Sequence, residues 1–277
     1  MTVKRLGIIG AGGIADVALT SLAQSLREPL AHVSILAREA SRAKAQALLD
    51  RLGDKLSAKR AVHDNLAAFL ADRLELVAEC ASHAAVRAHG AAILEAGCDL
   101  IIISVGALAD DDLRGSLERA ATTGASQFVL PPGAVGGLDA LAAARLSGLT
   151  SVIYTGRKPP NAWKGTPAQD LLDLDALDQP AVFYTGSARE AARDYPLNAN
   201  VAAALALAGI GFDKTQVRLV ADPGIERNVH EFAVGSACSD FTVRLGGRPS
   251  AANPKTSLMA GYSVARELIN RTGTMVV

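Results

Sequence analysis

The sequence contains few cysteines and carries no net charge. Its 277 residues include three cysteines, Cys80, Cys98 and Cys238, and no two of them form a Cys-x-x-Cys pair. A small, odd number of cysteines predicts reduced thiols rather than a disulfide framework or a zinc site. The 28 basic residues balance 28 acidic ones, so no overall field attracts nucleic acid or an anionic membrane. Any anion that the protein binds must therefore be held by a local site.

Long apolar runs are also missing. The first apolar stretch is interrupted by glycines and by Asp16, so it predicts neither a signal peptide nor a membrane span. Together with the reduced thiols, this predicts a cytoplasmic protein with no membrane partner. The sequence has no Gly-x-Ser-x-Gly elbow, no P-loop and no His, Cys and carboxylate set at metal spacing, so we expect no catalytic metal.

The first 130 residues alternate short apolar runs with alanine-rich helical patterns. The runs that predict strands are Leu6–Ile9, His32–Leu36, Leu74–Cys80, Leu100–Val105 and Gln127–Leu130. Strands that alternate with helices predict an α/β fold with a doubly wound parallel sheet, the Rossmann arrangement. Ser41 is expected to cap a helix that runs to about Leu52.

The pattern changes after Pro131-Pro132-Gly133, where glycine and proline become frequent. Longer strands are predicted at Ser151–Gly156, Ala181–Thr185, Gln216–Ala221, Asn228–Ala237 and Phe241–Leu245, and helices at Gly137–Leu146, Ala199–Ala208 and Pro254–Asn270. We therefore expect a nucleotide-binding domain over residues 1–130 and a second α+β domain, for the substrate and catalysis, over 131–250. The C-terminal helix within 251–277 is expected to pack back on the first domain.

A glycine-rich turn lies between the first strand and the first helix. Gly10, Gly12 and Ala15 fit the Gly-x-Gly-x-x-Ala form of the dinucleotide fingerprint. The first glycine permits the tight turn, the second lets the backbone approach a pyrophosphate, and the alanine allows close packing of helix on strand. We predict that Gly10, Gly12, Gly13 and Ile14 bind the cofactor, because the helix N-terminus offers N–H groups to its phosphates.

The end of the second strand bears on the choice between NAD and NADP. An acidic residue there would bind the ribose 2′-hydroxyl of NAD, but this sequence has Ala37 followed by Arg38, with Arg42 nearby. Arginine suits a 2′-phosphate. NADP is therefore favoured, with Arg38 as its contact, and NAD stays an alternative because Glu39 is close.

Several short segments, taken together and in order, resemble the L-aspartate dehydrogenase family. They are Glu79-Cys80-Ala81, Ser104–Asp110, Gly133–Asp139, Lys158-Pro159-Pro160, Tyr195–Val201, Ala221-Asp222-Pro223, Arg227–Glu231 and Asn253–Ser257. The resemblance covers nearly the whole chain. It implies a Rossmann domain with a substrate domain. It also implies oxidation of L-aspartate with NAD(P) to iminoaspartate, or to oxaloacetate and ammonia, in a reaction that can feed NAD biosynthesis.

The resemblance also implies roles for particular residues. The cofactor-contacting alanine and asparagine of the family fall on Ala134 and Asn200, and its active-site histidine falls on His230. This sequence departs from the family at Pro131-Pro132, where a serine-containing segment is more usual, and at Ala15, where many members have glycine. We predict that His230 lies at the cleft between the domains, where it accepts a proton or holds a substrate carboxylate.

A dicarboxylate amino acid needs cations or N–H donors in its site. Arg157, Lys158, Lys164 and Lys255 are the candidate cations of the second half, and Lys164 and Asn198 are the predicted substrate contacts. Asn198 precedes a helix and is equally suited to cap it.

Two other functions fit the same features. One is an oxidoreductase that resembles dihydrodipicolinate reductase or homoserine dehydrogenase, and a panel of substrates would separate it from an aspartate dehydrogenase. The other is a non-catalytic NAD(P)-binding sensor, which a test of turnover would identify. By analogy with such folds, a homodimer is expected.

Overall fold

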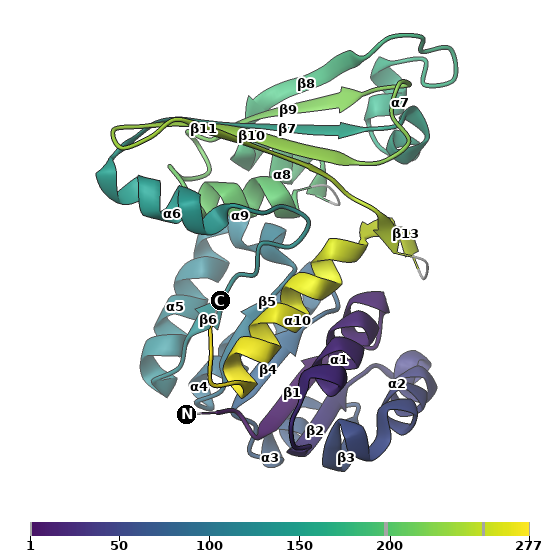
Figure 1. The fold of residues 1–277 in the computed structure, drawn as a ribbon, viewed down its shortest axis with the longest axis vertical. Coiled ribbons are helices and arrows are strands. Elements are labelled where there is room, and N and C mark those ends of the chain that lie inside the picture. The colour runs from purple at the N-terminus through teal and green to yellow at the C-terminus, as the bar shows by residue number, and fades with distance from the viewer. Residues whose placement is uncertain (1, 197–198, 251–252, 277) are drawn as a thin grey trace. The chain divides into compact units, whose positions relative to one another are not determined.

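The structure is a computed structural model that describes residues 2–196, 199–250 and 253–276. The chain forms two compact units, described separately below. Residues 1–131 and 260–277 form the first unit, and residues 132–259 form the second. The polypeptide therefore leaves the first unit after residue 131 and returns to it for its last helix (Figure 1).

The first unit is built on a six-stranded sheet in which every strand pair is parallel. Its strands are β1 (Arg5–Ile9), β2 (Leu30–Leu36), β3 (Ser57–His63), β4 (Leu76–Glu79), β5 (Asp99–Ile102) and β6 (Phe128–Val129). The order β3-β2-β1-β4-β5-β6 reverses direction between β1 and β4. This is the Rossmann order, and ligands of such sheets bind beyond the carboxyl ends of the strands at that reversal. The predicted fold class is confirmed.

Helices cover this sheet. They are α1 (Gly13–Ser25), α2 (Glu39–Leu52), α3 (Leu66–Ala71), α4 (His83–Glu95), α5 (Asp111–Gly124) and α10 (Leu258–Thr272), with short 3₁₀ turns at Gly53–Lys55 and Val105–Ala109. Helix α10 belongs to the same core, since Val264 and Leu268 are fully buried in it. A Cβ on Gly261 would lie 2.8 Å from Val17 of α1. The two helices therefore pack closely at this point.

Three expectations about these elements were wrong. Residues 253–257 form strand β13 (Asn253–Ser257), paired with β12 (Pro249–Ser250), and the last helix begins only at Leu258. Helix α2 begins at Glu39 with Arg38 as its N-cap, so Ser41 lies inside the helix and does not cap it. Strand β3 was not expected, because it is an edge strand with four polar residues among its seven.

The second unit is built on a mixed five-stranded sheet with the order β11-β10-β7-β9-β8. Its strands are β7 (Leu149–Lys158), β8 (Ala181–Ser187), β9 (Gln216–Ala221), β10 (Val229–Ser236) and β11 (Phe241–Gly246), and its helices are α6 (Leu138–Ser147), α7 (Ala168–Leu171), α8 (Ala188–Asp194) and α9 (Asn200–Ala208), with a 3₁₀ turn at Pro160–Trp163. Helices α6, α8 and α9 lie on one face of the sheet (Figure 1). On β7 the residues of that covered face, Val152, Tyr154 and Gly156, are buried, and they alternate with half-buried ones.

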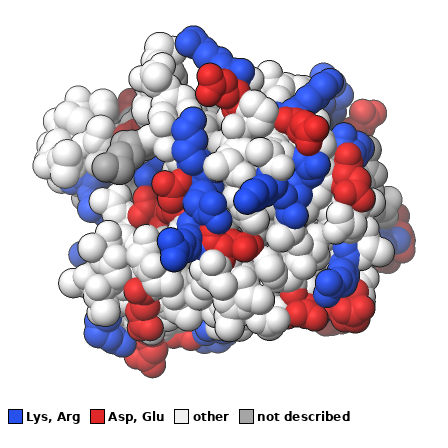
Figure 2. All heavy atoms as spheres, turned by 90° about the horizontal axis from the view of Figure 1, so that it is seen from below, with Lys and Arg blue, Asp and Glu red and all other residues white. Residues whose placement is uncertain are grey.

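Charges of both signs are interspersed on the face of the molecule in Figure 2. This agrees with the balanced composition, and this face therefore lacks the continuous positive surface that binds nucleic acid. Within the described residues, no helix is long and apolar enough to cross a membrane. In the same part of the chain, no three His, Cys, Asp or Glu side chains are arranged to hold a metal ion.

Candidate active site

The glycine turn joins β1 to α1 at the reversal of the first sheet. Gly10 has φ +91°, a backbone conformation that residues with a Cβ rarely adopt. Its N–H donates to the carbonyl of Leu36 at 2.9 Å, and a Cβ there would lie 3.0 Å from the Cβ of Ala81. Gly10 is therefore required by the fold of the turn itself.

Gly12 is glycine for a different reason. It is the N-cap of α1, with φ −81° and ψ −174°, an extended conformation that any residue can adopt. A Cβ at Gly12 would meet nothing within 4 Å. The missing side chain therefore keeps open the space in front of the helix N-terminus. There the N–H groups of the first turn, which begins with Gly13 and Ile14, have no partner within the helix. This open cradle fits a pyrophosphate.

A buried carboxylate supports the loops beside this turn. Glu79, at the end of β4, is fully buried, and its Oε1 accepts from the N–H groups of Ala81 and Ser82, both at 2.7 Å. Ser104, beyond β5, donates its N–H to Oε2 and its hydroxyl to Oε1, both at 3.0 Å. Burial nevertheless raises the pKa of Glu79. One side chain thus holds together the loops after two neighbouring strands, and one of those loops contacts Gly10.

Arg38 lies two residues after the end of β2 and is the N-cap residue of α2. Its side chain is exposed, and it has no ion-pair partner among the described residues. Arg42 lies one turn further along α2 and forms a 3.5 Å ion pair with Asp64. Within the described residues, Arg38 is therefore a cation without an ion pair, and it lies where the ribose of a dinucleotide would lie in this fold.

His230 lies on β10 of the second unit, directly opposite Gly156 of β7. Its Nδ1 is 2.8 Å from the hydroxyl of Tyr154, and the two rings are nearly parallel, with an angle of 14° between their planes. Tyr154 and His230 are both buried. The ring is therefore fixed in orientation by a neighbouring strand.

Lys158 is the second titratable group near His230. It lies on the same face of β7 as Tyr154 and Gly156, because side chains alternate along a strand, and its Nζ lies 4.6 Å above the centre of the Trp163 ring. Burial lowers the pKa of Lys158 to about 8. Burial, with a smaller contribution from the charge of Lys158, lowers the pKa of His230 to about 4. At neutral pH the imidazole is therefore uncharged, and Lys158 titrates just above neutrality.

Side-chain interactions hold the segments next to Lys158 and His230 in place. Arg157 pairs with the buried Asp222 at 2.9 Å, and the other oxygen of Asp222 accepts from the N–H of Gly224 at 2.8 Å. The indole N–H of Trp163 donates to the carbonyl of Val220 at 3.0 Å. Arg157 therefore has a structural partner already.

The other predicted site residues of the second unit lie at different places. Lys164 is half exposed and forms a 2.5 Å ion pair with the exposed Asp175. Asn200 is the exposed first residue of α9, whose N-cap is Ala199, and Ala134 is half buried in the loop before α6. Asn198 lies outside the described residues. The structure thus brings Tyr154 and Lys158, rather than Lys164, together with His230.

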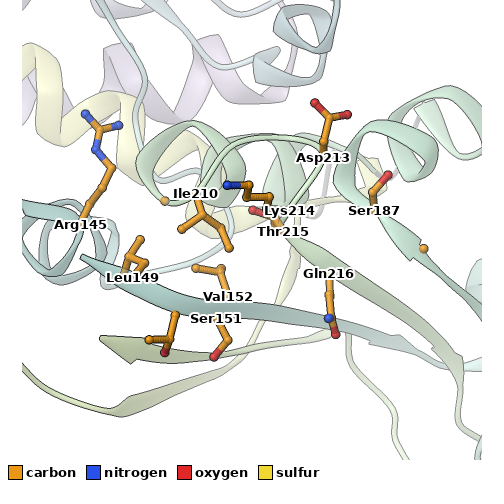
Figure 3. A pocket seen from close by; sticks show the side chains of 13 residues that line it. Arg145, Leu149, Ser151, Val152, Ser187, Ile210, Asp213, Lys214, Thr215 and Gln216 are labelled. Atoms are coloured by element: carbon orange, nitrogen blue, oxygen red, sulfur yellow. The ribbon is translucent and has the colours of Figure 1, made fainter. Parts of the chain in front are cut away.

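A pocket of about 790 Å³ opens at the other end of β7. Its lining includes Leu149 and Val152 of β7, Ile210, and the cations Arg145 and Lys214 (Figure 3). Neither His230 nor Lys158 lines it. The pocket is therefore separate from the group just described.

Sequence reasoning missed Tyr154 and Gly156. The available signal was their spacing, since residues 154, 156 and 158 fall on one face of a predicted strand. Their importance depends on β10 pairing with β7, two strands that are about 70 residues apart in the chain. No local pattern gives that pairing.

Comparisons with known proteins show the family of the chain. A family model described as "Aspartate dehydrogenase, C-terminal" matches residues 139–271, and one described as "Homoserine dehydrogenase, NAD binding domain" matches residues 10–131. The chain is 52% identical over 206 residues to the L-aspartate dehydrogenase of Polaromonas sp., a match that covers 74% of this chain and 77% of the relative.

Two solved structures show how far the likeness extends. The fold matches an aspartate dehydrogenase from Thermotoga maritima with a TM-score of 0.72, 25% identity and 99% of each chain covered. A dihydrodipicolinate reductase from Paenisporosarcina sp. matches with a TM-score of 0.50 and 14% identity, over 98% of this chain and 95% of that one. The second likeness concerns the fold alone.

Proposed function

We propose, from the premise that the chain belongs to the L-aspartate dehydrogenase family and is an NAD(P)-dependent oxidoreductase of aspartate, that His230 and Lys158 act on the substrate. The observation that carries this proposal is the fixed group of Tyr154, His230 and Lys158 on two paired strands. It combines an uncharged imidazole with an amine that titrates near pH 8.

The reaction sets two requirements for these residues. Oxidation of aspartate to iminoaspartate removes a hydride from Cα and a proton from the amino group, and the bound dinucleotide supplies the hydride acceptor. The substrate ammonium must lose its proton before the nitrogen lone pair can form the C=N bond. A nearby group that is partly unprotonated near neutrality is suited to accept that proton.

Lys158 meets the proton requirement. With a pKa of about 8, a substantial fraction of its side chain is a neutral amine at mildly alkaline pH, and the amine nitrogen has a lone pair to accept the proton. In the reverse direction the protonated Lys158 returns it. An ordinary lysine, with a pKa near 10.4, would be almost wholly protonated in the same range.

His230 is assigned to the substrate carboxylate. An imidazole with a pKa of about 4 is a weak proton acceptor at neutral pH, but its ring N–H is a good hydrogen-bond donor. Such a donor orients a carboxylate without adding a fixed charge. The alternative is that His230 itself accepts the proton.

Kinetics separate the two assignments. If His230 holds a carboxylate, His230→Ala raises KM for aspartate more than it lowers kcat. If it transfers the proton, kcat falls by roughly 10²–10⁴-fold. Lys158→Met should lower kcat within that range and remove the rise of kcat/KM with an apparent pKa near 8. Lys214→Met, at an exposed position of the second unit away from this group, is the matched control and should retain wild-type kinetics. Wild-type kinetics in both site variants would contradict the proposal.

The cofactor is NAD or NADP, and we propose that NADP is preferred. Arg38 supports this, since it is exposed, follows β2 and lacks an ion-pair partner in the described part of the chain. Gly10, Gly12, Gly13 and Ile14 would form the cradle for the pyrophosphate. Contacts from Ala134 and Asn200 to the cofactor are proposed on the family resemblance.

A homodimer is proposed as the assembly, and the cytoplasm as its location. The covered face of the second sheet carries helices α6, α8 and α9, and its other face is free of them in Figure 1, which is suited to a second copy. Free Cys80, Cys98 and Cys238 fit a reducing compartment. Light scattering of the purified protein tests the dimer, since a mass near 28.6 kDa would be that of a monomer.

A role in NAD biosynthesis remains a prediction.

A further inference from the structure

Three residues of β7 form one row beside His230. Tyr154, Gly156 and Lys158 alternate along the covered face of the strand, and Gly156 is the direct partner of His230 across the strand pair. Tyr154 and Lys158 are its diagonal neighbours, within reach of long side chains. The glycine opposite the histidine therefore leaves room on this face for the side chains of its diagonal neighbours.

Gly156 makes the contact of Tyr154 with His230 possible. A Cβ on Gly156 would lie 2.7 Å from the hydroxyl oxygen of Tyr154, closer than real Cβ atoms come to other atoms, and 3.2 Å from its Cζ, which is a tight contact. The phenol thus lies along the strand over the glycine and ends at Nδ1 of His230, 2.8 Å away. Any side chain at position 156 would displace it.

The tripeptide Tyr154-Thr155-Gly156 of β7 recurs in β8 as Tyr184-Thr185-Gly186, which provides an internal comparison. A Cβ on Gly186 would lie 2.6 Å from the hydroxyl of Tyr184, so this phenol also lies over the glycine two residues further on. The buried hydroxyl of Tyr184 has no hydrogen-bond partner within the described residues. The tyrosine–glycine geometry is therefore a local property of the strand, whereas the histidine contact is specific to β7.

The direction of the hydrogen bond follows from what each group can donate. Nδ1 of His230 is the single partner that the described residues offer to the hydroxyl of Tyr154. A buried O–H without an acceptor costs roughly 1–3 kcal/mol, so the phenol donates its proton to Nδ1. Burial also raises the pKa of Tyr154, so the phenol keeps this proton over the whole range in which enzymes work.

We propose that Tyr154 is a positioning residue that holds His230 in the tautomer with its proton on Nε2, and that Gly156 is the residue that permits it. The tautomer itself does not depend on the proposed function, but its consequence for aspartate binding rests on that function. His230 then presents an N–H donor, and not a lone pair, to the substrate, which makes it the partner of an anionic oxygen of aspartate. The proton acceptor must be another group, and Lys158 lies on the same row.

Nitrogen NMR on the free enzyme tests the tautomer without relying on activity. In protein labelled with ¹⁵N-histidine, a protonated ring nitrogen and an unprotonated one give well-separated signals. The signal of His230 among the five histidines is assigned by its absence from His230→Gln. At pH 7.5 the wild type should show Nε2 protonated and Nδ1 unprotonated. The reverse pattern would overturn the proposal.

Matched variants test the cause. Tyr154→Phe removes the donor and should give a mixture of both tautomers, while Tyr184→Phe, which removes the corresponding hydroxyl of β8, should leave the wild-type pattern. Gly156→Ala should reproduce the effect of Tyr154→Phe, because the methyl group displaces the phenol. An unchanged tautomer in Tyr154→Phe would show that Tyr154 has no part in setting it.

Kinetics connect the tautomer to the reaction. Tyr154→Phe should raise KM for aspartate roughly 5- to 30-fold, the range that corresponds to one hydrogen bond, with a smaller change in kcat and unchanged affinity for the cofactor. If NMR gives the expected tautomers but His230→Ala has wild-type kinetics, the proposed function fails and the tautomer assignment stands. If the tautomer is the reverse but His230→Ala is impaired, the tautomer assignment fails and the proposed function stands.

Discussion

At the scale of single residues, the uncharged state of His230 has a thermodynamic consequence. Burial lowers the pKa of His230 to about 4 in the folded protein, whereas an unfolded chain has a histidine pKa near 6.5. Between these two values the unfolded chain binds the extra proton and the folded protein does not. Stability is therefore lost as the pH falls through this window.

This predicts a difference between the wild type and His230→Gln in acid. As the pH falls from 7 to 4, the unfolding free energy of the wild type should decrease relative to the variant, by on the order of 3 kcal/mol in total. Urea unfolding at a series of pH values measures it. Parallel pH profiles of the two proteins would show that His230 titrates normally.

Arg38 sets a second prediction at this scale. Arg38→Ala should weaken binding of NADP by about 1–3 kcal/mol, the contribution of one charge-assisted hydrogen bond, and leave binding of NAD nearly unchanged. Fluorescence titration with both reduced cofactors measures this. Arg42→Ala is the control for general loss of charge, because Arg42 already pairs with Asp64. Equal losses for the two cofactors in Arg38→Ala would exclude a contact with the 2′-phosphate.

At the scale of elements, the two glycines of the β1–α1 turn are expected to fail in different ways. Gly10→Ala introduces a Cβ at φ +91° against Ala81 and should destabilise the fold by about 1–3 kcal/mol. Gly12→Val places its side chain in open space, so thermal stability should hardly change while cofactor affinity falls at least tenfold. Calorimetry and cofactor titration on both variants check this. Normal NADP binding by Gly12→Val would show that the space in front of α1 is not part of the cofactor site.

The sequence predicts elements well where their pattern is determined locally. The strand Gln216–Ala221 is confirmed at both ends, because polar and apolar residues alternate in its first half and a short apolar run completes it. Strand β3, with the sequence Ser-Ala-Lys-Arg-Ala-Val-His, follows no such pattern, since it lies at the edge of its sheet and is covered only partly. Its existence depends on pairing with β2, which no local signal encodes.

The candidate site shows the same division. His230 follows from the family resemblance alone, and no pattern in the residues distinguishes it from a structural histidine. Among the candidate lysines, Lys158 and Lys164 are equivalent in sequence. The structure separates them, because Lys158 ends β7 with its Nζ over the ring of Trp163, whereas Lys164 lies in the following loop with Asp175.

At the scale of the molecule, the first unit depends on a helix from the other end of the chain. Leu268 of α10 is fully buried in the core of this unit. Leu268→Ala should therefore lower the unfolding free energy by about 2–5 kcal/mol, the usual cost of a large-to-small change in a core. Arg266→Ala, at an exposed position of the same helix, should change it by less than about 0.5 kcal/mol. Similar values for the two variants would mean that α10 packs loosely.

The return of the chain to its first unit also determines the order in which the protein can be completed during translation. Domains generally fold as units while the ribosome is still adding residues, beginning at the N-terminus. Here residues 132–259 form a contiguous unit, and nearly all of them are synthesised before α10. The nucleotide-binding unit begins first, but its core lacks Val264 and Leu268 until the whole second unit has been synthesised. The newly made chain therefore completes the core of its nucleotide-binding unit only after residues 132–259 have been synthesised.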